Sequence, residues 1–124
     1  MIGALITCTV AMFAVAAVSF WTARRASAGT LPRNDLIGIR TAATRASDAA
    51  WVAAHRAGAA DLRRTGVAAL ATAVLPWAAV VVPDAYREVV IVVAILGGVG
   101  AILGFSVHAA VVGGRAARAV TDAG

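Results

Sequence analysis

The sequence has no lysine, only one cysteine and few charged residues of either sign. Charged side chains make up 14% of its 124 residues, whereas soluble domains average about 25%. Hydrophobic residues account for 61% and are gathered in long runs. The polar side chains are too few to cover a water-facing surface. We therefore expect a single membrane domain, residues 1–124.

The cysteine and histidine content argues against disulfides and metal sites. Cys8 lies in the first apolar run and has no partner in the chain. The two histidines, His55 and His108, have no third ligand at a suitable spacing. The sequence predicts no metal and no cofactor.

Because lysine is absent, the positive charge is carried by arginine: eleven Arg against six acidic residues, a formal net charge of +5. Clustered arginines attract phosphates, including those of nucleic acids. Here most of them lie in residues 24–65, between two apolar runs. That placement favours a topology signal and anionic lipid headgroups as partners, and no nucleic acid.

Three apolar runs predict transmembrane helices at about 1–23, 66–82 and 89–112. Arg24 and Arg25 follow the first run, whereas a signal peptide carries its positive charge before the run. We therefore expect an uncleaved anchor. The second run is short and contains Pro76, which predicts a kink.

The distribution of arginine also predicts the orientation. Residues 24–65 and the C-terminal tail are basic, and the connector 84–88 has more acidic than basic residues. The sequence thus predicts an outside N-terminus, a cytoplasmic first loop, an outside connector and a cytoplasmic C-terminus.

A helix is predicted to begin at Ser47, a good N-cap followed by Asp48 in the first turn. One of its faces carries residues at intervals of four, three and four: Trp51, His55, Gly58 and Leu62. The predicted fold is therefore an all-α membrane protein, with three transmembrane helices and a cytoplasmic amphipathic helix between the first and second spans. This helix could lie flat or continue into the second span, with Gly58 and Gly66 as bend points.

The third run is rich in glycine, and Gly100 and Gly104 form a G-x-x-x-G pair with Gly97 one turn earlier. Small residues at this spacing allow helix backbones to approach closely in lipid. The sequence predicts a packing face, and leaves open whether the partner helix is internal or belongs to another subunit, including a second copy.

The polar segment between the first two runs carries the most specific pattern. It contains Leu31-Pro32-Arg33-Asn34, Ile37-Gly38-Ile39-Arg40-Thr41, Ser47-Asp48-Ala49-Ala50-Trp51 and His55-Arg56-Ala57-Gly58. This order resembles the signature of SdpI-family membrane proteins. Ala42 stands where that family often has proline, and the chain is shorter than the family's namesake, an immunity protein with more spans.

The resemblance implies a small bacterial inner-membrane protein, with roles in protection against a secreted toxin and in membrane signalling. It also singles out eight candidate residues for binding a partner or an anion: Asn34, Gly38, Arg40, Thr41, Asp48, Trp51, His55 and Arg56.

Two interpretations of these residues can be compared. Asn34, Arg40 and Arg56 could bind a lipid phosphate or a peptide carboxylate. Alternatively, Arg40 could pair with Asp48 or Asp35 and fold the loop onto the helix. No catalytic site is predicted, because capping explains Ser47 and Asp48, and His55 lies two turns away.

The sequence favours a non-enzymatic membrane protein that engages a protein partner, a membrane subunit or a cytoplasmic regulator, through its cytoplasmic loop. The alternative is a small accessory subunit of a larger membrane enzyme or transporter complex. A stand-alone transporter or enzyme is less favoured, because no charged side chain lies in the middle of a predicted span.

Overall fold

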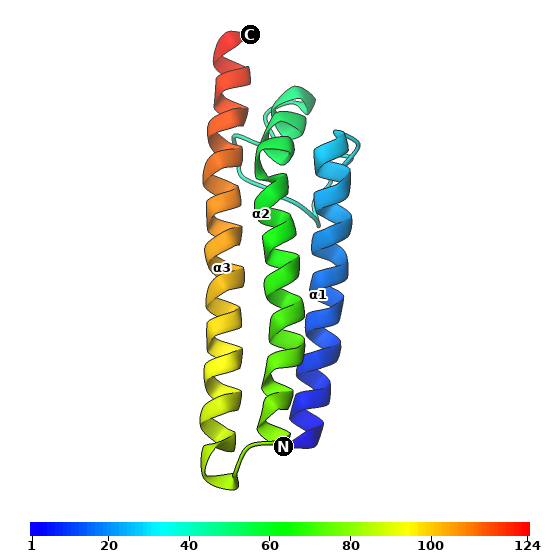
Figure 1. Ribbon diagram of the computed structural model, residues 1–124. Coiled ribbons are helices and arrows are strands. Elements are labelled where there is room, and N and C mark those ends of the chain that lie inside the picture. Colours follow the sequence, from blue (N-terminus) through cyan, green and yellow to red (C-terminus); the bar gives the residue numbers. More distant parts are fainter.

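The computed structural model describes residues 1–124, and all of its regular secondary structure is helical. Helix α1 (Ile2–Ala28) leads through a loop to α2 (Asp48–Val74), which is followed by the short 3₁₀ helix η1 (Leu75–Val80) and by α3 (Asp84–Ala123). The three long helices run side by side with α2 in the middle (Figure 1). α2 contacts both neighbours, whereas α1 and α3 have almost no contact with each other.

Helices α1 and α3 are long and apolar enough to cross a membrane. Only 11% of the most apolar window of α1, and none of that of α3, is buried inside the protein. Core helices of soluble proteins bury such surface, so these faces are suited to lipid. α2 does not reach the same apolarity, so the predicted count of three spans is not supported by hydropathy. Buried polar side chains, including Thr65 and Thr72, contribute to this difference.

Of the two alternatives for the helix that begins after Ser47, the structure shows the continuous one. α2 is one α-helix from Asp48 to Val74, and neither Gly58 nor Gly66 divides it. Both glycines receive side chains from other segments: an added Cβ would lie 2.7 Å from Ile39 Cδ1 at Gly58 and 2.9 Å from the Phe20 ring at Gly66. Packing on both sides keeps the helix continuous despite its glycines.

The start of α2 is as predicted, whereas the later boundaries differ. Ser47 caps the helix by accepting a hydrogen bond from Ala50 N–H at 3.0 Å. Near Pro76 the α-helix gives way to η1, because proline cannot donate the next helical hydrogen bond. α3 begins at Asp84, directly after Pro83, and continues well beyond the predicted end at residue 112.

The α2–α3 contact uses a glycine other than the predicted ones. Gly98 faces Thr72 so closely that a Cβ at this position would overlap the threonine side chain. A Cβ on Gly97, Gly100 or Gly104 would meet nothing within 4 Å. No helix of this chain therefore covers these three glycines.

We expect Gly98→Ala to destabilise the protein by about 1–3 kcal/mol, since the added methyl group must push α2 and α3 apart. Gly97→Ala is the matched control, because it is the adjacent residue and a Cβ there would meet no other atom within 4 Å. This variant should leave stability unchanged or raise it slightly. Thermal unfolding of the two variants in the same detergent measures the difference. Equal midpoints would contradict this close packing.

Candidate functional site

The loop of residues 29–47 lies across one end of the helices and is attached to α2 at two points (Figure 1). The first attachment is Trp51, whose indole N–H donates to the Leu31 carbonyl at 2.9 Å. Trp51 is 1% exposed, so both its ring and its polar N–H are satisfied inside the protein. The tryptophan thus holds the first part of the loop.

The second attachment is His55, one helical turn after Trp51. Its Nε2 accepts the Ile39 N–H at 2.8 Å, and its Nδ1 lies 2.8 Å from the Trp51 carbonyl. Because Nε2 is an acceptor, the ring proton is on Nδ1 and is donated to that carbonyl. Burial lowers the pKa of His55, although the hydrogen bond to Trp51 opposes this effect. Both geometry and burial favour the neutral imidazole.

The side chain of Ile39 enters the contact between α2 and α3. A Cβ added to Gly58 of α2 would lie 2.7 Å from the Ile39 Cδ1 atom, and one added to Gly113 of α3 would lie 3.0 Å from it. Larger residues at either glycine would occupy the same space. Ile39 therefore joins the loop to both helices through one apolar contact and one backbone hydrogen bond.

Gly38 precedes this anchor and has φ +109°, a backbone conformation that side chains disfavour. A Cβ on this residue would also overlap the His55 ring. Thus both the conformation and the close approach to His55 require glycine here.

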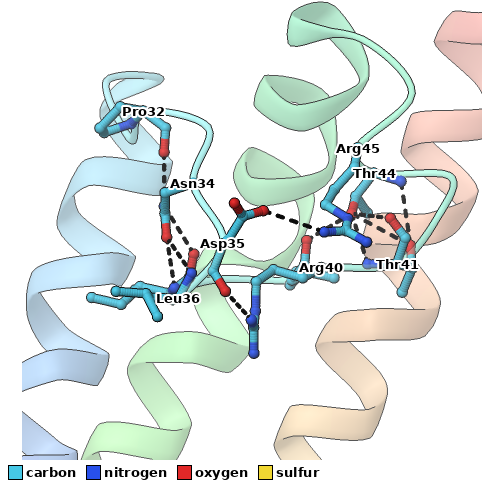
Figure 2. A network of polar contacts seen from close by, with 10 residues as sticks. Pro32, Asn34, Asp35, Leu36, Arg40, Thr41, Thr44 and Arg45 are labelled. Atoms are coloured by element: carbon cyan, nitrogen blue, oxygen red, sulfur yellow. Dashed lines mark hydrogen bonds and ion pairs between the residues drawn. The ribbon is translucent and has the colours of Figure 1, made fainter.

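Hydrogen bonds within the loop complete its fold. Thr44 is fully buried; its hydroxyl donates to the Ile39 carbonyl at 2.7 Å and accepts the Thr41 N–H at 3.0 Å. The Asn34 side chain accepts from the N–H groups of Leu36 and Ile37 and donates to the carbonyls of Pro32 and Ile37 (Figure 2). Asn34 is thus occupied by the turn that it forms.

Charged side chains lie on the outer side of the loop. Arg45 pairs with Asp35 at 3.4 Å (Figure 2), and Arg33 pairs with Asp48 at 3.2 Å. Both carboxylates are about nine-tenths exposed, so each pair contributes no more than about 1 kcal/mol. An open groove of about 570 Å³ is lined by Arg33, Asn34, Asp35, Ala42 and Arg45.

The inner side of the loop covers a second cavity, of about 520 Å³, between α1, α2 and α3. Residues Leu36–Thr41 line it together with hydroxyl groups and apolar residues from all three helices. Arg40 lies at this cavity, and its guanidinium donates to the Asp35 carbonyl (Figure 2). Of the two pairings considered for Arg40, the one with Asp35 is present, through the backbone carbonyl rather than the carboxylate. Asp48 pairs with Arg33 instead.

The eight candidate residues fall into two groups. Asn34, Gly38, Thr41, Trp51 and His55 are used in folding the loop onto α2. Arg40, Asp48 and Arg56 are exposed. The Arg56 guanidinium lies against Gly29 at the end of α1, whereas Arg40 lies over the cavity, so their environments differ. An anion site made by Arg40 and Arg56 stays a prediction.

The structure adds three participants that the sequence did not indicate. Ile39 and Thr44 are core residues of the loop. For Thr44 there was a signal in the sequence: Thr41 and Thr44 are three residues apart, a spacing at which threonine side chains bond to nearby backbone groups. Asp61 is buried in α2 and lies 2.6 Å from His108 Nδ1 on α3. Nothing in the local sequence reveals this pair, because it depends on the register between two helices.

We expect Gly38→Ala to detach the loop from α2, since the alanine is strained at positive φ and overlaps His55. The expected destabilisation is about 1–3 kcal/mol. Faster amide exchange at Ile39, measured by hydrogen–deuterium exchange, would report the lost hydrogen bond. Gly3→Ala serves as the control because its surroundings are open; unchanged exchange at Ile39 in Gly38→Ala would disprove the expected role.

Comparison with known proteins agrees with the resemblance seen in the loop. The profile of the SdpI/YfhL protein family matches residues 30–108, which include all but the first residue of the loop, α2, η1 and much of α3. No curated protein and no solved structure gives a significant match. The family match covers well over half of the chain. The chain also has two apolar helices, α1 and α3, whose exposed surfaces suit a membrane protein. The chain is therefore a membrane protein of the SdpI/YfhL family.

Proposed function

We propose that this protein is a non-enzymatic membrane component that recognises a protein partner through the outer side of its folded loop. The role would be protection against a toxin or membrane signalling, the general context that the family resemblance implies. The observation that carries the proposal is that the inner and outer sides of the loop differ. Its inward-facing groups are satisfied by α2, while Arg33, Asp35 and Arg45 remain exposed around an open groove.

A loop built in this way suits recognition. Three charged side chains stand on a backbone fixed by Trp51 and His55, so little conformational entropy is lost when a partner binds. The outer groove combines both signs of charge, which favours a partner surface with complementary charges over a simple anion.

We further propose that α2 crosses the bilayer with α1 and α3, in a bacterial inner membrane. The part of α2 from Asp61 onward, together with η1, corresponds to about 30 Å, enough to cross the hydrocarbon core. α2 packs against a helix on each side, which shields its threonines from lipid. The excess of arginine supports a cytoplasmic loop and C-terminus and an outside N-terminus.

The alternative function is that of an accessory subunit in a larger membrane complex. The observation that favours it is the open face of Gly97, Gly100 and Gly104 on α3, which no helix of this chain covers. A helix from another protein or from a second copy could approach closely there.

The proposed orientation predicts opposite labelling at the two ends of the bundle. In a Cys8→Ala background, Ala42→Cys should be protected from an impermeant thiol reagent in intact cells, whereas Ala85→Cys should react. Both positions are exposed on the protein surface, so both should react after the cells are permeabilised. Labelling of Ala42→Cys in intact cells would reverse the orientation.

Removing the exposed loop charges should abolish partner recovery without reducing the amount of protein. We expect the double variant Arg33→Gln/Arg45→Gln to retain at most about a tenth of the partner in a mild-detergent pull-down quantified by mass spectrometry. It should accumulate normally, because exposed ion pairs contribute little stability.

Two further variants distinguish the alternatives. Arg115→Gln/Arg118→Gln removes the same charge from the exposed C-terminal part of α3 and should keep the partner. Gly97→Leu/Gly100→Leu blocks the open face of α3 and leaves the loop intact. Partner loss in the leucine variant together with retention in the loop variant would replace the loop proposal with the accessory-subunit function.

A further inference from the structure

A cluster of three ionisable side chains lies between α2 and α3, away from the loop. Asp61 is at its centre, with its side chain only 4% exposed. One carboxylate oxygen accepts from Arg64 at 2.8 Å, and the other lies 2.6 Å from His108 Nδ1. An ionised carboxylate buried among helices needs such partners, and both of its oxygens have one.

Each of the two basic side chains contacts Asp61 through one nitrogen, and the rest of it is largely exposed. Their side chains are 59% exposed for Arg64 and 61% for His108. Arg64 uses a single nitrogen for Asp61, and the structure gives its remaining donors no partner. His108 uses Nδ1, which leaves Nε2 free. Asp61 thus positions an arginine fork and an imidazole ring side by side on the surface.

Space for a ligand lies next to these groups. A cavity of about 400 Å³ is lined by Asp61, Arg64, Ala101, Gly104, Phe105 and His108. Gly104 is one helical turn before His108, and a Cβ on it would meet nothing within 4 Å. The cavity therefore continues from the basic groups along the apolar surface of α3.

The depth of the cluster follows from the helix contacts. Phe20 of α1 packs on Gly66 of α2, and the two helices are antiparallel (Figure 1). About one turn further in the same direction, α1 reaches Arg24 while α2 reaches Asp61. The cluster is thus level with the end of the apolar run of α1, where lipid phosphates lie if α1 spans the bilayer.

We propose that Arg64 and the imidazolium form of His108 bind the phosphate of an anionic phospholipid. Arg64 supplies a charge-assisted fork, and His108 donates from Nε2 while Asp61 accepts from Nδ1. With Asp61 ionised, the three groups carry a net charge of +1, complementary to a phosphodiester. The groove beside Gly104 accepts the apolar part of the lipid. This site is independent of the loop and of its proposed protein partner.

Binding of short-chain phosphatidylglycerol to the purified full-length protein tests the site. We expect Arg64→Gln and His108→Gln each to weaken the apparent affinity about tenfold, the loss of one charge-assisted hydrogen bond. Arg63→Gln is the matched control, since it removes the same charge from a neighbouring exposed residue and should bind as the wild type does. Equal binding by all four proteins would overturn the proposal.

Two more measurements keep the outcome clear. Gly104→Leu fills the groove and removes no charge, so it should weaken lipid binding even if a charge variant folds poorly; unchanged binding would overturn the lipid part. Titration with inorganic phosphate separates the possible sources. Binding of phosphatidylglycerol alone identifies a lipid headgroup, whereas equal binding of inorganic phosphate that depends on Arg64 and His108 identifies a free phosphate site.

Discussion

The hydrogen bond from the Ile39 N–H to His55 Nε2 is the interaction on which the loop depends. It requires a neutral imidazole with its proton on Nδ1, and that proton is accepted by the Trp51 carbonyl. It also requires the backbone at Gly38 to pass directly over the ring. One histidine thus sets the position of the loop, and the groups that support it account for much of the family motif.

The position of α2 explains why polar residues are tolerated in this bundle. A helix with neighbours on two sides can bury hydroxyl groups that bond to its own backbone, as Thr65 and Thr72 do with carbonyls four residues earlier. The outer helices each pack mainly against α2, and the window of each that is suited to crossing a membrane is strongly apolar. Membrane character is therefore shared unequally among the three helices.

Much of the architecture could be predicted from the sequence, and the failures have physical reasons. The N-cap at Ser47 can be predicted from the residue and its immediate neighbours, and the apolar runs that form α1 and α3 are evident from composition. The continuity of α2 could not be predicted from the sequence, because it depends on side chains of distant residues, Ile39 and Phe20, that fill the spaces at its glycines. Likewise, Gly98 differs from its neighbours only through the register of α3 against α2. The loop residues were found as a motif, but their contacts needed three-dimensional structure.

The length of α3 has a mechanical consequence. Its 40 residues form one uninterrupted rod of about 60 Å, whose far end stands beyond the loop (Figure 1). About 25 residues of α3, or roughly 38 Å, follow Gly98. A tilt of about 10° at the Gly98–Thr72 contact would therefore carry the C-terminus sideways by roughly 7 Å. Small adjustments of the packing between α2 and α3 would thereby become larger displacements at the C-terminal end of α3.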